Sequence, residues 1–349
     1  MPRRNLAGLL GGLVLLAACT GPAATTAPTG APATGAPATS TPASEAPTSA
    51  APTEGAVPDT LVLGLVPSRE ADVLVENAQP LADYLTTELG ITVESFVPQD
   101  YPGLVAAMAT GQAHIGAFGP FGLIQSVDQA GAEIILQSAR DGAVTYHTQW
   151  MTNDPDTYCL DEVVTDEDGL AYCNGTMDAT EGPAGEDGIA AIAEGTTVSF
   201  VTETSASGYI FPALQLLQLA GLDRETDIDP LFAGGHDASV IAVCNGDAPV
   251  GVAFDDARTI LAEGDCDDLS QVVVFAYSQE IPNDGVSVAS NLPDALKQQI
   301  ADALIAYADT EEGAAVLDSV YEIDEFAPAD LDAFDVVRQA ADELGVTSD

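Results

Sequence analysis

A hydroxyl-rich segment, Thr204-Ser205-Ala206-Ser207-Gly208, stands between a predicted strand and a predicted helix. The first turn of a helix leaves backbone N–H groups without partners and carries about half a positive charge. Together with the serine hydroxyls, these N–H groups are suited to hold an oxyanion. The simpler alternative is that Ser205 or Ser207 only caps the helix. The sequence alone leaves both interpretations open.

The chain is strongly acidic, which restricts its partners and the way in which it can bind an anion. It has 349 residues, with 55 Asp and Glu against 8 Lys and Arg, and a formal net charge of −47. Nucleic acid is excluded as a partner, because such a chain would repel it. This composition is typical of proteins that stay hydrated in concentrated salt, where screening weakens repulsion between like charges. A site for an anion must therefore build its own local positive potential.

The N-terminus has the pattern of a secretion signal. Two arginines precede an apolar run over residues 6–18, which is too short to span a bilayer. The run ends in the sequence LAAC, which resembles the processing box of bacterial lipoproteins. We therefore expect a signal peptide over residues 1–18, lipid on Cys19 and attachment to the outer side of the cell membrane. The alternative is an ordinary signal peptide with an incidental Cys19.

The next part of the chain is predicted to be a tether. Residues 19–57 are almost entirely Ala, Pro, Thr, Ser and Gly, which cannot bury enough apolar surface to offset the entropy of ordering. The remainder is long enough for two lobes, each with a core.

Cys19 apart, the chain has four cysteines, and an even number suits an oxidising compartment. Connectivity does not follow from sequence, but pairing of Cys159 with Cys173 and of Cys244 with Cys266 closes two short loops and is favoured. A zinc site is the alternative, although the close cysteine spacing of such sites is absent. The acidic stretch between Cys159 and Cys173 matches no EF-hand spacing, so we expect a solvated loop there, and neither metal nor cofactor.

Hydrophobic periodicity predicts alternating strands and helices, and hence an α/β fold with a parallel-type sheet. The predicted strands cover residues 60–66, 91–97, 115–118, 133–138, 197–201, 250–254 and 272–276. The predicted helices run from residue 72 to 89, 101–110, 121–129, from 208 onward, 293–307 and 329–344.

Five segments together resemble the phosphate-, phosphite- and phosphonate-binding proteins of ABC importers, which have the type II periplasmic-binding fold. They are DYPGLVAAMATGQAHIGAFGP at 100–120, TSASGYIFP at 204–212, GGHDASVIAVCNGDAPVG at 234–251, DDA at 255–257 and IPNDG at 281–285. The resemblance implies two α/β lobes with a ligand cleft between them. Lobe 1 would comprise residues 58–146 and 280–349, and lobe 2 residues 147–279, with an acidic, disulfide-pinned insertion near 153–190.

The resemblance also implies ligand contacts at nine positions. Hydroxyls and backbone N–H groups of Ser205, Ala206, Ser207 and Gly208 would hold the oxyanion, and the Tyr101 and Tyr146 hydroxyls and the His236 ring would donate to it. Asp256 and Asp284 would accept a proton from a cationic amino group on the ligand or from a P–OH group. Since Asp256 is shorter than the glutamate of some relatives, the amino group is the weaker alternative.

The expected function is that of an extracytoplasmic solute-binding lipoprotein, which captures a phosphonate or a related oxyanion and delivers it to a permease. A ligand-sensing ectodomain for a signalling partner would share the same site. A hydrolase using Ser207, His236 and Asp256 is less favoured, because the G-x-S-x-G nucleophile elbow is absent. We therefore expect no enzymatic activity.

Overall fold

The computed structural model describes residues 55–140, 142–179 and 182–347. The expected signal peptide, the lipidated Cys19 and the tether as far as residue 54 lie outside these ranges. Within the described part of the chain, no helix has both the length and the hydrophobicity needed to cross a bilayer.

The first of two large sheets has six strands in the order β15-β4-β14-β3-β1-β2. Their bounds are Thr60–Leu65 (β1), Thr92–Phe96 (β2), Ile115–Phe118 (β3), Glu133–Ala139 (β4), Gly285–Val288 (β14) and Glu325–Pro328 (β15). β1 is parallel to β2 and β3, whereas β14 is antiparallel to β3 and β4, and β15 to β4. The expected parallel-type sheet is thus a mixed one, because β14 enters directly from a crossing strand and not through a crossover helix.

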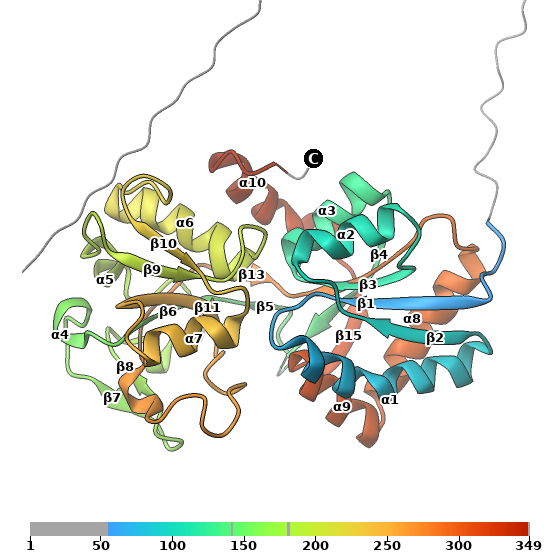
Figure 1. The fold of residues 1–349 in the computed structure, drawn as a ribbon, viewed down its shortest axis with the longest axis horizontal. Helices are drawn as coiled ribbons and strands as arrows, with labels where there is room; N and C mark the ends of the chain where they lie inside the picture. Colours follow the sequence, from blue (N-terminus) through green and yellow to red (C-terminus); the bar gives the residue numbers. More distant parts are fainter. Residues whose placement is uncertain (1–54, 141, 180–181, 348–349) are drawn as a thin grey trace, which may run out of the picture. The chain divides into compact units, whose positions relative to one another are not determined.

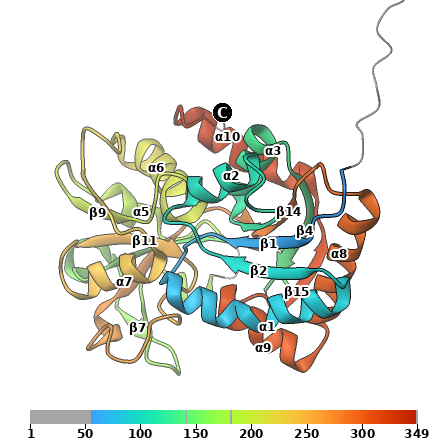
Figure 2. The same cartoon turned by 45° about the vertical axis from the view of Figure 1, so that its right-hand side comes forward.

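Helices cover both faces of the first sheet (Figure 1), and a second viewpoint shows the same layers (Figure 2). On one face lie α1 (Ala71–Leu89), α8 (Asp294–Ala308) and α9 (Glu311–Tyr321), and on the other α2 (Tyr101–Ala109) and α3 (Pro120–Ala130). α1 buries a stripe that includes Leu74, Leu81 and Leu85, and it ends at Gly90, whose φ of 65° suits a residue without a Cβ.

The second sheet has seven strands in the order β10-β9-β11-β6-β12-β8-β7. Their bounds are Thr148–Thr152 (β6), Val164–Thr165 (β7), Ala171–Tyr172 (β8), Thr197–Phe200 (β9), Asp229–Phe232 (β10), Val250–Phe254 (β11) and Val273–Tyr277 (β12). A continuous helical segment follows β9, namely the π-helical η2 (Ala206–Ile210), α6 (Phe211–Gln215) and the π-helical η3 (Leu216–Ala220). α7 (His236–Cys244) packs against β11 and β9.

Two short strands mark where the chain passes between the sheets. β5 (Thr145–Tyr146) pairs antiparallel with β13 (Ile281–Pro282), so the outgoing and returning segments lie side by side. Near the C-terminus, the helix expected from residue 329 begins later, as α10 (Asp335–Glu343), because Leu331–Phe334 forms a 3-10 turn capped by the Asp330 side chain. The predicted lobe boundaries at residues 146 and 280 stay predictions.

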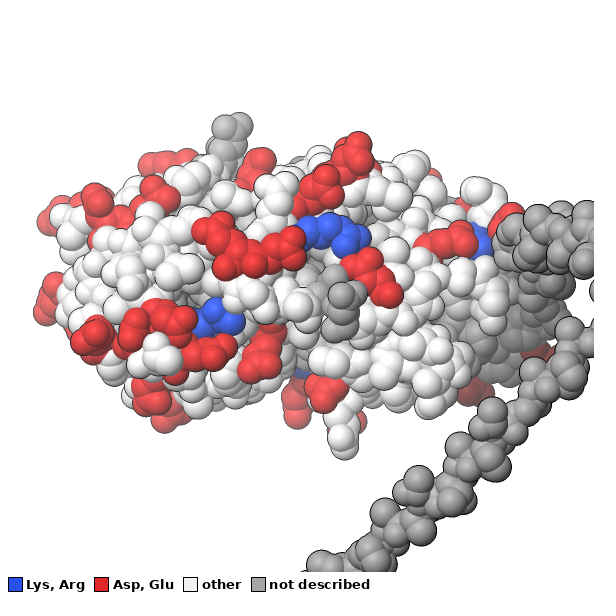
Figure 3. All heavy atoms as spheres, turned by 90° about the horizontal axis from the view of Figure 1, so that it is seen from above, with Lys and Arg blue, Asp and Glu red and all other residues white. Residues whose placement is uncertain are grey.

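Acidic side chains cover much more of the surface seen in Figure 3 than basic side chains do. On the face shown in Figure 3, Asp and Glu are scattered over the described chain, and the few basic side chains lie beside them. The basic residues are thus largely committed to acidic neighbours.

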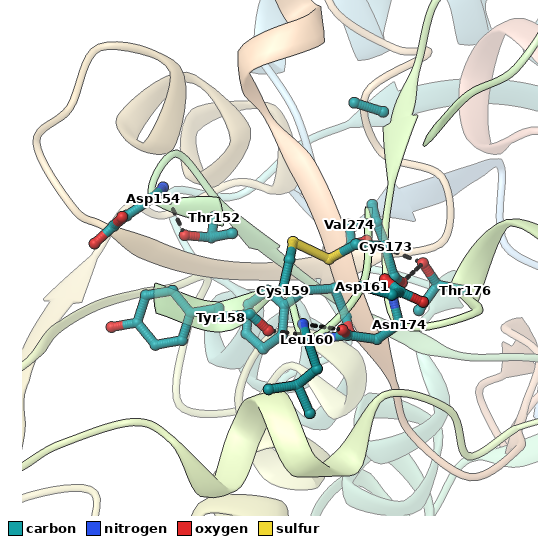
Figure 4. Close-up of a disulfide and its surroundings, with 12 residues drawn as sticks. Thr152, Asp154, Tyr158, Cys159, Leu160, Asp161, Cys173, Asn174, Thr176 and Val274 are labelled. Carbon is teal, nitrogen blue, oxygen red and sulfur yellow. Dashed lines mark hydrogen bonds between the residues drawn. A yellow bond between two sulfur atoms is a disulfide. The ribbon is translucent and has the colours of Figure 1, made fainter. Parts of the chain in front are cut away.

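Both disulfides have the pairing that the sequence favoured. Cys159 is joined to Cys173 and Cys244 to Cys266. Around the first bond (Figure 4), Leu160 N–H donates to Asn174 Oδ1 at 2.7 Å, and the Asn174 amide donates to the Phe275 carbonyl at 3.0 Å. The acidic insertion predicted near residues 153–190 is therefore fastened to β12. This insertion contains the short helices α4 (Pro155–Tyr158), η1 (Thr176–Asp178) and α5 (Glu186–Ala190).

A buried arginine organises the neighbouring turn. Arg258 is 1% exposed, and its guanidinium pairs with Asp256 at 2.5 Å. Its Nη1 donates to the carbonyls of Ala171 and Val272, both at 2.8 Å. The group also lies over the Tyr172 ring, with 4.5 Å from Cζ to the ring centroid. Arg258 therefore links the β11 end to β8 and β12.

Replacing Arg258 with Met should leave Asp256 without its partner and lower the unfolding free energy by about 3–5 kcal/mol. Arg338→Gln is the control, because Arg338 is 40% exposed in its pair with Asp128 and an exposed pair contributes about 0–1 kcal/mol. Denaturant unfolding of both variants measures the difference. Equal stabilities for Arg258→Met and wild type would contradict this role for the buried pair.

Candidate functional site

A cavity of about 80 Å³ is lined by residues of both large sheets and of the crossing strand β5. Since a water molecule needs roughly 10–15 Å³ of such space, the cavity can hold a small solute. Its polar lining comprises Ser68, Arg69, Tyr101, Arg140, Tyr146, Thr204, Ser205, Ser207, His236, Asp284 and Tyr321, and Ala206 also borders it. Seven of the nine predicted ligand residues are therefore brought together; Gly208 and Asp256 are not among the lining residues.

The predicted oxyanion cradle is the start of the helical segment after β9. Ser205 is its N-cap, and the Ser205 hydroxyl accepts from Gly208 N–H at 3.1 Å. No hydrogen bond within the described chain satisfies the N–H groups of Ala206 and Ser207, which follow the cap. The capping and anion-binding interpretations are therefore compatible, with different groups serving each.

Gly208 contributes by its lack of a side chain. A Cβ at this position would lie 2.4 Å from Val201 Cγ2 and 2.8 Å from Ser205 Oγ, so a larger residue would push the helix start away from β9. Its N–H group is already used by Ser205. Gly208 thus has a packing role in this structure, and its expected direct contact with the ligand stays a prediction.

Two buried tyrosines complete the ring of donors. Tyr101 begins α2, which the Asp100 side chain caps, and Tyr146 lies in β5. Burial, and then the nearby Asp284 carboxylate, raise the pKa of both hydroxyls well above the ordinary value of 10. The Ser207 hydroxyl is hydrogen-bonded to Tyr146 and partly offsets the rise in the Tyr146 pKa. Both tyrosines thus remain protonated and able to donate.

His236 is held as a neutral donor. It is the first residue of α7, and its Nδ1 accepts from the Phe254 N–H at 3.2 Å, which places the ring proton on Nε2. Burial, followed by the charges of Arg69 and Arg140, lowers the His236 pKa to about 3. The ring can therefore donate a hydrogen bond at neutral pH without carrying charge.

The two predicted carboxylates are both committed to arginines. Asp284 pairs with Arg140 at 2.6 Å, and Arg140 also donates to Asn283 Oδ1 at 3.1 Å. Asp256 does not line the cavity, because its carboxylate is bound to Arg258 and accepts from the Tyr172 hydroxyl at 3.2 Å. In this structure Asp256 supports the β11 turn, and its expected contact with the ligand stays a prediction.

Arg69 and Arg140 are the residues that sequence reasoning missed. Arg69 follows β1 and Arg140 follows β4, and both line the cavity. The signal in the sequence was the small number of basic residues, because only six remain besides the two in the predicted signal peptide. Two of these six at strand ends were candidates for the positive potential that an anion site requires.

Two ring side chains that follow Tyr146 in the sequence, His147 and Trp150, have structural contacts. His147 Nδ1 lies 3.1 Å from Asp255 Oδ2, and His147 Nε2 accepts from Gly182 N–H at 2.9 Å. Trp150 is fully buried and donates to Gln215 Oε1 at 2.9 Å. Ser207, His236 and Asp256 are not hydrogen-bonded to one another within the described chain. The arrangement of a nucleophilic triad is thus not formed there.

The comparisons with known proteins agree with this geometry. A family model described as "ABC transporter, phosphonate, periplasmic substrate-binding protein" matches residues 63–334. The phosphate-import protein PhnD of Mycolicibacterium smegmatis is 29% identical over 219 residues, 60% of each chain. The phosphonates-binding periplasmic protein of Escherichia coli is 22% identical over 74% of this chain and 69% of the relative. This chain thus spans about 60% of the length of the mycobacterial relative.

Solved structures establish the fold. A binding-protein component of an ABC phosphonate transporter from Pseudomonas aeruginosa matches with a TM-score of 0.66 and 20% identity, over 83% of this chain and 89% of that one. PhnD1 of Prochlorococcus marinus, in complex with methylphosphonate, also has a TM-score of 0.66, with 15% identity over 83% and 99% of the two chains. The fold is the two-lobe type II periplasmic-binding fold, as the sequence predicted.

The neutral state of His236 predicts a specific acid sensitivity. As pH falls from 6.5 towards 3, the unfolded chain takes up a proton at this ring that the folded protein does not. Stability should therefore fall by about 1.4 kcal/mol per pH unit from His236 alone, on top of the carboxylate contributions. Denaturant unfolding over this pH range should give a shallower slope for His236→Gln than for wild type. Identical slopes would contradict the neutral, buried ring.

Proposed function

Because the chain belongs to the family of periplasmic substrate-binding proteins of phosphonate ABC transporters, we propose that it is the solute-binding component of an importer. Its ligand is a phosphonate or a related phosphorus oxyanion such as phosphite or phosphate, which it delivers to a permease. The ligand lies in the cavity beside the start of η2.

The observation that carries this proposal is the convergence of uncharged donors on one small cavity. The free N–H groups of Ala206 and Ser207 meet the neutral ring of His236 and the hydroxyls of Tyr101 and Tyr146 around it. Aligned donors at a helix start favour an oxyanion, and a dry site strengthens each bond. A tetrahedral oxyanion presents several acceptor oxygens and is matched by such a set.

The lining also bears on the ligand's substituent. Asp284 is already paired with Arg140 and Asp256 is elsewhere, which disfavours a cationic amino group as the feature recognised. Apolar side chains such as Val66, Phe254 and Val286 border the same cavity. A small, uncharged substituent fits these surroundings, and the Prochlorococcus relative contains methylphosphonate.

Two lobes closing on the ligand account for the contacts around the cavity. Residues 58–146 and 280–349 form lobe 1, and residues 147–279 form lobe 2. His236 N–H in lobe 2 donates to the Ser68 carbonyl in lobe 1 at 2.9 Å, and Thr259 donates to Glu322 at 3.0 Å. Opening must break both bonds, so a ligand that contacts both lobes stabilises the closed form that the permease recognises.

The proposed location is the outer side of the cell membrane, with lipid on Cys19 and the tether of residues 19–57 between lipid and lobes. The family's periplasmic description and the LAAC sequence support it. A sensing role with a signalling partner would use the same site. Catalysis is not proposed, because among the described residues no carboxylate is hydrogen-bonded to Ser207 or His236.

Titration calorimetry against methylphosphonate, phosphite, phosphate and an aminoalkylphosphonate tests the proposed function. Ser207→Ala removes a hydroxyl donor that all these ligands share, so each ligand should weaken by roughly 1–3 kcal/mol, or about five- to 150-fold. Ser126→Ala is the matched control, since Ser126 is a buried serine whose hydroxyl donates to Leu123 O away from the cavity. Wild-type protein that binds none of the four ligands would refute the proposal.

Replacing Cys19 with Ala should abolish metabolic labelling by radioactive lipid and move the protein from the membrane fraction to the soluble fraction. The reason is that the thiol is the proposed attachment point. Fractionation and labelling of cells that express the variant measure this directly. Labelled, membrane-bound Cys19→Ala protein would show that the anchor lies elsewhere.

A further inference from the structure

The basic residues of the described chain differ in whether they form an ion pair, and this difference bears on how the ligand is bound. Five of the six form an ion pair with a carboxylate: Arg140 with Asp284, Arg224 with Glu225, Arg258 with Asp256, Lys297 with Glu133 and Asp294, and Arg338 with Asp128. Arg69 has no carboxylate oxygen within ion-pairing distance among the described residues. In a chain with 55 acidic residues, this is the exception.

The hydrogen-bonding capacity of Arg69 is also only partly used. Its Nη1 donates to the Ser319 carbonyl at a long 3.3 Å, whereas its Nε is buried and makes no hydrogen bond within the described chain. A buried donor without a partner is costly, which is why such groups are rare in native proteins. Thr204 Oγ1 is in the same condition, and both residues line the cavity.

The position of Arg69 is fixed relative to His236, another donor of the cavity. The carbonyl of its neighbour Ser68 accepts from His236 N–H at 2.9 Å, which brings the end of β1 against the start of α7. The Arg69 charge acts on the His236 ring and helps to lower its pKa, so the guanidinium lies near the donor that faces the cavity. Arg140 is equally close to the site, but its charge is matched by Asp284.

We infer that Arg69 is the cation of lobe 1 that binds the ligand's oxyanion opposite the helix start of lobe 2, and that it selects the dianionic form of the ligand. This assignment rests on the proposed function and adds a specificity-determining residue to it. A guanidinium forms two parallel hydrogen bonds to phosphorus oxygens, and the bond strengthens with the charge that it faces. The uncharged donors of lobe 2, such as the N–H groups of Ala206 and Ser207, discriminate less between the monoanion and the dianion of the ligand.

Two carboxylates bear on the strength of this contact. Glu322 and Asp237 lie near enough to raise the Arg69 pKa through space, while burial lowers it more. Glu322 is itself held by the Thr259 hydroxyl at 3.0 Å. Neither carboxylate forms an ion pair with Arg69 in the described chain. The ligand can therefore bind the guanidinium without first breaking an ion pair.

The test is titration calorimetry with methylphosphonate on the acidic and the alkaline side of its second ionisation. Arg69→Gln should weaken the dianion by roughly tenfold to 150-fold, and the monoanion by a clearly smaller factor. Arg69→Lys keeps the charge without the fork and should give an intermediate affinity for the dianion. Arg338→Gln, which changes an arginine outside the cavity lining, should match wild type at both pH values.

The possible outcomes separate this inference from the function on which it rests. Wild-type binding that Arg69→Gln leaves unchanged, or weakens equally for monoanion and dianion, overturns the role of Arg69 and leaves the proposed function intact. Wild-type protein that binds no phosphorus oxyanion overturns both. If Arg69→Gln does not fold, Arg69→Lys decides, because an affinity for the dianion equal to that of wild type would exclude recognition by the guanidinium fork.

Discussion

One electrostatic constraint governs the structure: the whole protein is strongly negative, whereas an anion site needs a positive potential in its cavity. A chain with a net charge of −47 repels anions, yet its cavity is lined by N–H and O–H donors and by two of its few arginines. Burial allows the cavity to attract an anion despite the net charge. Charges outside the cavity are weakened by water and salt, whereas donors inside it act at short range in a low dielectric. Most other basic residues are fixed in ion pairs, so they contribute little to the potential felt inside the cavity.

Much of the first sheet was predictable because its elements satisfy local rules. The strand Ile115–Phe118 is a short apolar run, and α1 ends at a glycine that adopts a positive φ. The elements that were not predicted carry no such signals: β14 and β15 are four residues each, and their direction is set by pairing with strands far away in the sequence. α7 is buried on several sides, so it lacks an amphipathic pattern. The second sheet is mixed as well, since β9 is parallel to β10 and β11 whereas β6 is antiparallel to β11 and β12. The strand directions in both sheets therefore could not be predicted from local sequence.

The candidate site was predictable where a backbone feature forms it and less so where long side chains meet. Ser205 and Ser207 stand at a strand-to-helix turn, and both line the cavity. Arginines, in contrast, reach their targets from positions that sequence does not relate: Arg140 meets Asp284 across 144 residues of chain. Similarly, Asp256 matches the family pattern, but Arg258, two residues further on, turns its carboxylate away from the cavity. A pattern of residue types fixes a position on the backbone, whereas the partner of a flexible charged group follows only from the packed structure.

The hydrogen bond from the Phe254 N–H group to His236 has a consequence for proton exchange in the proposed binding role. This bond and burial keep the ring uncharged well below neutral pH, so it donates through Nε2 without carrying charge. The tyrosine hydroxyls, whose pKa values are raised, behave in the same way. These donors therefore exchange no proton at neutral pH, so in the proposed binding role any proton released or taken up comes from the ligand.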